Sequence, residues 1–390
     1  MIDFLFFYHP HSSYEVNPTA QFGLGLLKLA TWAKQLGSSV RVINAQGIKD
    51  KKYLDMIVDC KYLMLYGCLI DAPIINEISK YNRIRKKAKY VFVGGPIGKS
   101  PEFLNLNNIT ALVDGFGEDF VEDLHNGIIR EGVIRIPKLK MHIDEYPYPK
   151  RELLQGFYGG NIFIKDEFNK GISSTILTSL GCYYHCAFCM SGGETFCQNY
   201  SMKRVKEEIE DCVRLGIKHF RISDDNIINK KNRLEELCDI LKFYNITWRA
   251  SIRVKPSSVE MYRLMIESGC VELSFGIESG DQFVLDNLQK GTKVQWNTDA
   301  IRNAKKAGIG FVRALMMMGT PFETYDTLEL NKQWITEADP DMVCLKIFVP
   351  YPGTPIFDNP TKYKCKLLPL TDPNNSAYRP DDSQVTANID

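Results

Sequence analysis

The sequence has almost no net charge. Its 390 residues include 48 lysines and arginines and 47 aspartates and glutamates, which leaves a formal charge of +1 at pH 7. Without a strong charge of one sign, the chain has no general attraction to nucleic acid or to an anionic membrane surface. We therefore expect a small-molecule or peptide substrate, and neither nucleic acid nor a membrane as a partner.

The first residues do not predict a leader sequence or a membrane-spanning helix. The segment MIDFLFFYHP has an acid at position 3, no basic residue before the apolar stretch and only five or six consecutive apolar residues. A signal peptide needs a basic start and a longer apolar region, and a membrane-spanning helix needs about twenty apolar residues. The expected location is the cytoplasm.

The cysteines do not form a disulfide framework. There are eleven, an odd number, and they are scattered from Cys60 to Cys365. Disulfides are rare in the reducing cytosol, so most of these side chains are expected to be buried thiols. The one dense group, Cys182, Cys186 and Cys189, therefore stands out.

The first third of the chain alternates short apolar runs with helical stretches. Strands are expected at 3–8, 39–44, 62–67, 90–95 and 110–115, and a helix at 23–36. Strands that are apolar on both faces, with helices between them, are typical of a parallel sheet covered on both sides. Residues 1–130 are therefore predicted to form a doubly wound, Rossmann-like α/β domain.

A second α/β region follows a polar, proline-containing linker at 131–172. Strands are expected near 173–179, 218–223, 246–253, 270–276, 310–317 and 341–348. Gly216, Gly269 and Gly308 each stand between a helical stretch and a strand, where glycine supplies a left-handed cap. Six such units predict a partial (β/α)6 barrel of the TIM type over residues 173–355, followed by a tail at 356–390.

The spacing of the three clustered cysteines is compatible with more than one role. Positions i, i+4 and i+7 also share one helix face, so buried core thiols are one interpretation. The β-branched run before them ends at Gly181, however, which places them in the loop after the first barrel strand, where barrel enzymes carry their chemistry. A structural zinc site needs four ligands, and no second cysteine pair with suitable spacing is present. We favour an iron-sulfur cluster.

The C-x3-C-x2-C loop, with Phe188 before its last cysteine, resembles that of the radical S-adenosylmethionine (SAM) superfamily. The resemblance implies a [4Fe-4S] cluster bound by Cys182, Cys186 and Cys189, with one iron left for the amino and carboxylate groups of SAM. It also implies an electron donor such as flavodoxin or ferredoxin. One electron would then break the sulfonium bond and yield a 5'-deoxyadenosyl radical, which abstracts hydrogen from the substrate.

Further motifs resemble those of the same family and imply contacts with SAM. FRISDDN puts Asp224 and Asp225 at the end of the second barrel strand, with a helix cap as the alternative role. Arg253 ends the third strand. ELSFGIESGD resembles the family's GIESG signature, which implies that Glu278 and Ser279 meet the ribose or the amino group.

Two other segments bear on the same site. Arg313, before the G-x-P-x-E-T stretch that resembles the family's, is expected to pair with the methionine carboxylate of SAM. The triplet Gly192-Gly193-Glu194 looks like the family's Gly-Gly-Glu motif but follows Cys189 too closely to reach the second strand. We interpret this triplet as the exit of the cluster loop.

A doubly wound domain ahead of a radical barrel resembles the subclass with an N-terminal cobalamin-binding-type domain. GGP at 94–96 and GFGED at 115–119 match loop glycines of that subclass, so Gly94, Gly95 and Gly115 are candidate cobalamin contacts. The same glycines are also ordinary residues of tight turns. His9, in the loop after the first strand, is expected to be solvated rather than to bind cobalt.

Three functions follow from these patterns. The first is a radical SAM enzyme that uses cobalamin to methylate or otherwise modify a small molecule or peptide. The second is a cobalamin-independent radical SAM dehydratase, epimerase or oxidoreductase with a vestigial cobalamin fold. The third is a non-catalytic iron-sulfur carrier, for which the SAM-contacting set would be needless.

Overall fold

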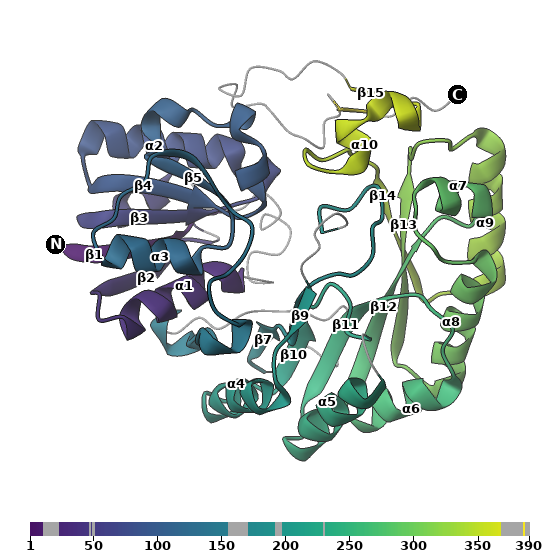
Figure 1. Ribbon diagram of the computed structural model, residues 1–390. Coiled ribbons are helices and arrows are strands. Elements are labelled where there is room, and N and C mark those ends of the chain that lie inside the picture. Colours follow the sequence, from purple (N-terminus) through teal and green to yellow (C-terminus); the bar gives the residue numbers. More distant parts are fainter. Residues whose placement is uncertain are drawn as a thin grey trace. The chain divides into compact units, whose positions relative to one another are not determined.

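Two six-stranded parallel sheets organise the chain, each in its own compact unit (Figure 1). One unit comprises residues 1–161 with 370–382, and the other 162–369 with 383–390. The computed structural model describes residues 1–10, 23–46, 48, 51–154, 171–191, 197–228, 231–367 and 385–386. Among these residues, no helix is both long and apolar enough to cross a membrane.

The first sheet has the strand order β2-β1-β3-β4-β5-β6, and its strands all run parallel. The strands are Ile2–Tyr8 (β1), Val40–Asn44 (β2), Cys60–Tyr66 (β3), Ala88–Gly94 (β4), Ala111–Gly115 (β5) and Gly132–Ile136 (β6), and the helices are Leu24–Gln35 (α1), Ala72–Arg85 (α2) and Glu118–His125 (α3). The predicted parallel α/β domain is confirmed. Because β1 lies between β2 and β3, the direction of winding reverses between β1 and β3, where ligands bind in such sheets.

The first sheet continues beyond the predicted domain end at residue 130. β6 pairs with β5 from Ala111↔Gly132 to Gly115↔Ile136. Only two of its five residues are buried, as expected for an edge strand, so the sequence carried no strong apolar signal here. The following segment also joins this unit, since the Tyr146 hydroxyl donates to Asp119 across 2.5 Å.

The second sheet has the order β14-β13-β12-β11-β10-β7, again parallel throughout. Its strands are Ser173–Ile176 (β7), His219–Ile222 (β10), Thr247–Arg253 (β11), Cys270–Glu278 (β12), Phe311–Met318 (β13) and Met342–Ile347 (β14). The helices are Met202–Arg214 (α4), Lys231–Phe243 (α5), Val259–Glu267 (α6), Gln282–Asn287 (α7), Val294–Ala307 (α8) and Tyr325–Ala338 (α9). Each strand lies within three residues of its predicted limits. Gly216, Gly269 and Gly308 have φ of +80°, +92° and +99°, which confirms the left-handed caps.

The two faces of the second sheet carry different side chains. In β11, Trp248, Ala250 and Ile252 are buried, and Trp248 Nε1 donates to the Ser268 carbonyl just after α6. That face meets the helices, which form an outer layer in Figure 1. The alternate residues, including Arg249 and Arg253, are half-buried and occupy the opposite face.

Candidate active site

The three clustered cysteines lie in a loop just after β7. Two short antiparallel strands, Ser179–Gly181 (β8) and Cys197–Asn199 (β9), precede and follow this loop. Gly181 turns the chain into the loop with a φ of +80°, which a side chain would strain. The loop therefore leaves the carboxyl end of a strand of the second parallel sheet, which is the edge where ligands bind in parallel α/β folds. Gly192-Gly193-Glu194 lies outside the described residues.

The thiols of this loop are close enough to affect one another. Burial raises the pKa of Cys182 and Cys189, and Asp225 and the neighbouring cysteine sulfurs raise it further. Thiolates held together in this way repel one another unless positive charge lies between them. In the part of the chain described, no three His, Cys, Asp or Glu side chains converge as they would around one metal ion. Three thiols on one loop are the donor type that iron-sulfur clusters use, so the residues present fit such a cluster.

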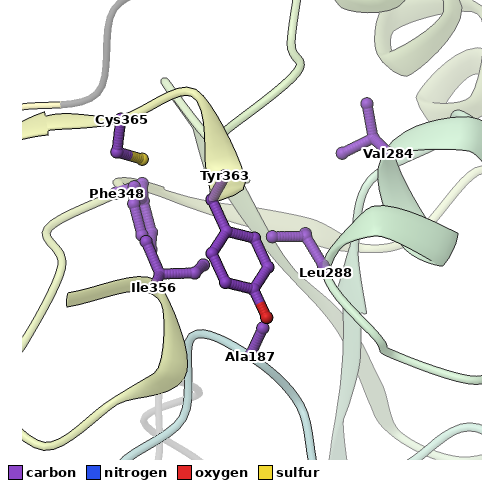
Figure 2. Packing of buried hydrophobic residues seen from close by; sticks show 7 residues of the cluster. All are labelled: Ala187, Val284, Leu288, Phe348, Ile356, Tyr363 and Cys365. Carbon is purple, nitrogen blue, oxygen red and sulfur yellow. The ribbon is translucent and has the colours of Figure 1, made fainter. Parts of the chain in front are cut away.

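The cysteine loop is anchored at Ala187, between the second and third cysteines. Its amide donates to the Leu288 carbonyl across 2.9 Å, and its carbonyl accepts from the Ile356 amide across 3.2 Å. Figure 2 shows Ala187, Leu288, Ile356 and the ring of Tyr363 packed together in one buried cluster. Two backbone hydrogen bonds and a buried apolar cluster therefore hold this turn.

Asp224 fastens the start of the loop to the end of β10. Its carboxylate accepts from the Thr178 amide at 2.6 Å, the Thr178 hydroxyl at 2.5 Å and the Ser179 hydroxyl at 2.8 Å. Burial raises its pKa, and these hydrogen bonds oppose the rise. Both oxygens are engaged within the protein. The exposed Asp225 accepts from Ser191 across 3.3 Å and so borders the loop's far end.

Arg253, at the end of β11, reaches the cysteine loop. Its Nη1 donates to Sγ of Cys186 across 3.1 Å, and its guanidinium lies 3.8 Å from the centre of the Tyr184 ring. A planar guanidinium can make both contacts at once because it stacks on the ring and donates in its own plane. The structure thus places Arg253, a residue that the sequence predicted for the site, in contact with the cysteine loop.

Glu278 and Lys290 form a buried ion pair at the carboxyl end of β12. Glu278 Oε1 lies 2.6 Å from Lys290 Nζ, and both side chains are about nine-tenths buried. Glu278 has a φ of +67°, a left-handed conformation that is rare for a residue with a side chain and is found at functional sites. Lys290 Nζ also lies 5.8 Å from the Phe188 ring, so the pair adjoins the cysteine loop.

Ser279 joins a second buried network rather than an open rim. Its hydroxyl donates to Asn331 Oδ1 across 3.0 Å, and Asn331 Nδ2 donates to Glu323 Oε1 across 3.1 Å. Glu323 also accepts from the amides of Gly319 and Thr320, and burial raises its pKa. This network ties the ends of β12 and β13 to α9.

Arg313 does not reach the cysteine loop. It is the third residue of β13, near the amino end of the strand, and its Nη2 donates to Glu272 Oε1 across 2.5 Å. Arg249 Nη1 donates to the same oxygen across 3.0 Å. The structure therefore places Arg313 beside Glu272 and Arg249, several residues before the carboxyl ends of the strands.

The loops after β1 and β3 meet at the switch point of the first sheet. His9 is buried there, which corrects the expectation that it is solvated. Its Nε2 lies 2.8 Å from the Tyr66 carbonyl oxygen and its Nδ1 lies 2.8 Å from that of Pro10. Both ring nitrogens therefore face carbonyl oxygens of the protein itself.

The three candidate cobalamin glycines differ in what the fold requires of them. A Cβ at Gly95 would lie 2.8 Å from the Gly67 carbonyl oxygen, and one at Gly115 would lie 2.1 Å from that of Ile136; both residues have positive φ. The fold itself therefore demands these two. A Cβ at Gly94 would meet nothing closer than 3.9 Å, so its missing side chain leaves space that the protein does not need.

Sequence reasoning missed several residues of the site. Lys290 and Asn331 lie in segments with no motif of their own, and Tyr184 is one of the variable positions within the cysteine motif. Only the folded chain brings these side chains beside Glu278, Ser279 and Arg253. Cys197 was also passed over. Its Sγ donates to the Gly181 carbonyl across 3.5 Å, and burial raises its pKa, as does the nearby Cys182.

Comparisons with known proteins agree with this geometry. The sequence model of the Radical SAM superfamily matches residues 176–335, from the end of β7 into α9. An uncharacterized methyltransferase of Pyrococcus horikoshii is 30% identical over 319 residues, which are 75% of this chain and 67% of that protein.

Two solved structures share the fold over both units. TsrM from Kitasatospora setae, a radical SAM methyltransferase solved with cobalamin and a [4Fe-4S] cluster, matches 91% of this chain and 74% of its own, with a TM-score of 0.72 and 16% identity. OxsB, a cobalamin-dependent radical SAM enzyme, matches 100% of this chain and 64% of its own, with a TM-score of 0.74 and 17% identity. At these identities the likeness concerns the fold alone.

Proposed function

Because the chain belongs to the radical SAM superfamily and is a radical SAM enzyme that uses SAM and a [4Fe-4S] cluster, we propose that it methylates a small-molecule substrate with the help of cobalamin. The observation that carries the methylation is that the cysteine loop and a doubly wound unit occur together in one chain whose relative in Pyrococcus horikoshii is named a methyltransferase. The fold shared with TsrM and OxsB supports the same proposal.

The proposed ligands of the cluster are Cys182, Cys186 and Cys189. When bound, the cluster and SAM supply a 5'-deoxyadenosyl radical and cobalamin supplies a methyl group. The anchor at Ala187 holds the ligand loop, and the guanidinium of Arg253 supplies positive charge beside one cysteine sulfur. Because the loop and Arg253 are already held in place, the energy of ligand binding can be used to orient the reacting groups and is not needed to order the protein.

The proposed contacts of SAM divide into two groups. Asp225, Arg253 and Glu278 border the cysteine loop through Ser191, Cys186 and the Lys290–Phe188 contact, so we propose direct contact for them. Asp224, Ser279 and Arg313 have their polar atoms engaged by other side chains, and we propose that they position the site.

The proposed cobalamin site is the switch point of the first sheet. The space beside Gly94 supports a large ligand there, and the engaged ring of His9 supports cobalamin bound without a histidine on cobalt. We propose the cytoplasm as the location, with a donor such as flavodoxin or ferredoxin to reduce the cluster.

The products that the protein forms from SAM test the proposal. Anaerobic reconstitution, SAM and dithionite should yield 5'-deoxyadenosine, and Cys186→Ala should abolish it while the circular dichroism spectrum is retained. Methyl transfer from SAM also leaves S-adenosylhomocysteine, so protein supplied with cobalamin and substrate should form both nucleosides. A cobalamin-independent dehydratase, epimerase or oxidoreductase would form only 5'-deoxyadenosine and retain no corrin absorption. An iron-sulfur carrier would form neither product.

A further inference from the structure

Three exposed lysines lie close together in the chain after α10, the short helix Pro355–Asp358. Lys362, Lys364 and Lys366 alternate with two buried residues, Tyr363 and Cys365. Among the described residues, no carboxylate forms an ion pair with any of the three lysines. Positive charge that the protein leaves unpaired on its surface attracts a partner of opposite sign. We refer to these three lysines as the lysine row.

Aromatic rings lie beside the lysine row. Lys364 Nζ lies 5.6 Å from the centre of the Phe322 ring. The Phe322 ring meets the Phe283 ring edge to face, with 6.0 Å between their centres. Phe283 is 60% exposed, although a phenyl ring gains free energy when it leaves water. An exposed aromatic group bordered by unpaired charge resembles a protein-binding surface, in which an apolar centre is surrounded by a polar rim.

One buried layer separates this surface from the cysteine loop. The Tyr363 ring packs against Ala187 and Leu288 in the buried cluster of Figure 2. Phe322 packs against the same cluster. Ala187 follows Cys186 directly in the chain, so the cluster contacts the turn that carries the proposed iron ligands. The lysine row and its aromatic neighbours belong to the same unit as that turn.

We propose that the lysine row, with Phe283 and Phe322, docks the protein that reduces the iron-sulfur cluster, and that this donor is a small acidic one-electron carrier. This inference rests on the proposed function, because only a protein with a redox cluster needs such a donor. Three cations without internal counter-ions recognise clustered carboxylates and repel a basic protein. The transfer moves one electron from the reduced donor to the oxidised cluster, and it neither forms nor breaks a covalent bond.

The composition of the surface suits a transient complex. An electron carrier binds, delivers its electron and leaves, and such complexes bury less area than stable ones. Exposed lysines raise the rate of encounter, and salt weakens their effect because it screens the charges. A nucleic acid fits less well, since surfaces that follow phosphates use more basic residues than three and the whole chain has a net charge of only +1.

Isothermal titration calorimetry with a purified acidic flavodoxin, under anaerobic conditions, tests the surface in the full-length protein. Wild type should bind the flavodoxin, and the binding should weaken several-fold between about 50 and 300 mM sodium chloride. Reversing the charge of the whole lysine row should weaken binding about tenfold or more in Lys362→Glu/Lys364→Glu/Lys366→Glu. A matched control reverses three exposed lysines that precede β10, β11 and β13, and it should bind within about twofold of wild type: Lys218→Glu/Lys242→Glu/Lys306→Glu.

The source of the electron separates docking from the chemistry at the cluster. With reduced flavodoxin, the lysine-row variant should form 5'-deoxyadenosine about tenfold or more slowly than wild type. Dithionite is a small reductant that needs no docking site, so it should support equal rates in the two proteins. Phe283→Ser, at the exposed ring, should weaken flavodoxin binding about fivefold and leave its salt dependence unchanged.

Several outcomes would overturn the docking surface. These are a flavodoxin that does not bind wild type, one that binds the lysine-row variant as tightly as the control, and a single-stranded DNA that binds wild type more tightly than the flavodoxin does. A change of oligomeric state in the lysine-row variant alone, seen by analytical ultracentrifugation, would assign the surface to a second copy of this chain. If the charge-reversed variant does not fold, replacing the same lysines by glutamine should weaken binding by a smaller factor.

The same experiments distinguish this inference from the proposed function. Protein that binds flavodoxin through the lysine row but forms no S-adenosylhomocysteine, when cobalamin and substrate are supplied, loses only the proposed methylation. Protein that forms both nucleosides with dithionite, but binds flavodoxin equally well with and without the lysine row, loses only the docking surface.

Discussion

Arg253 donates a hydrogen bond to the sulfur of Cys186, the middle ligand of the proposed cluster, across 3.1 Å. A cation at a ligand sulfur stabilises the reduced cluster, which carries one more negative charge. Arg253→Gln should therefore lower the midpoint potential by about 60 mV, which is a tenfold change in a one-electron equilibrium. A redox titration followed by electron paramagnetic resonance measures the shift. Arg302→Gln is the control, and a potential that Arg253→Gln leaves unchanged would contradict the expected role.

Asp224 should contribute mainly to the stability of the protein rather than to SAM binding. Asp224→Ala leaves the buried donors of Thr178 and Ser179 without an acceptor, and we expect a loss of about 3 kcal/mol in the free energy of unfolding. Asp225→Ala, at the exposed neighbour, should change it by about 0.5 kcal/mol or less. Urea unfolding under anaerobic conditions compares the two. If Asp224→Ala instead weakens SAM binding with full stability, Asp224 is a cofactor ligand, as the sequence motif implies.

Lys290 should control SAM affinity through Glu278. Lys290→Gln leaves the Glu278 carboxylate buried and unpaired, which should cost about 3 kcal/mol of stability. We also expect the dissociation constant for SAM to rise about tenfold, as measured by equilibrium dialysis. Lys293→Gln, at an exposed lysine nearby, should alter neither quantity. SAM binding at wild-type affinity in folded Lys290→Gln would argue against contact between Glu278 and SAM.

Substitutions at the adjacent residues Gly94 and Gly95 should distinguish an effect on cobalamin binding from an effect on stability. Gly94→Ala should keep the stability of the wild type, because its Cβ meets only ordinary contacts, whereas Gly95→Ala should lose about 1–3 kcal/mol through positive φ and close approach. A bulkier Gly94→Leu should lower the corrin absorption retained by protein expressed with cobalamin. If folded Gly94→Leu protein retains the full corrin absorption, cobalamin does not bind beside Gly94.

Cys197 should be dispensable for cluster binding, although it lies near Cys182. It sits in β9, held by its hydrogen bond to the Gly181 carbonyl, rather than in the loop that carries the three ligands. Cys197→Ser should therefore retain about four irons per chain after reconstitution, and Cys186→Ser should retain far fewer. Iron analysis alongside the visible spectrum measures both. Equal losses in the two variants would make Cys197 a fourth ligand and remove the open iron that SAM requires.

The sequence predicted the elements well because strong local signals mark them. Apolar strands and glycine caps located the strands of both sheets to within a few residues, and Gly216, Gly269 and Gly308 adopt the expected left-handed conformation. β6 was not predicted, because an edge strand needs few apolar residues. Its pairing with β5 depends on backbone hydrogen bonds, which leave little trace in the side-chain pattern.

The site was less predictable than the fold. Arg253 reaches the cysteine loop as its position at the end of a strand suggested, but Arg313 and Arg249 converge on Glu272 because parallel strands place residues of like depth side by side. Strand register sets that convergence, and no single motif records it. The burial of His9 likewise depends on the carbonyl of Tyr66, which is distant in the sequence.

The backbone bonds of Ala187 to Leu288 and Ile356 also bear on biosynthesis. A nascent chain cannot close this turn until the ribosome has extruded the segment around Ile356, which takes on the order of ten seconds or longer after the cysteines emerge. If iron were delivered to the growing polypeptide, the loop that carries the three cysteines would not yet be held in its final conformation. We therefore expect the cluster to be inserted after translation, once the segment around Ile356 has closed this turn.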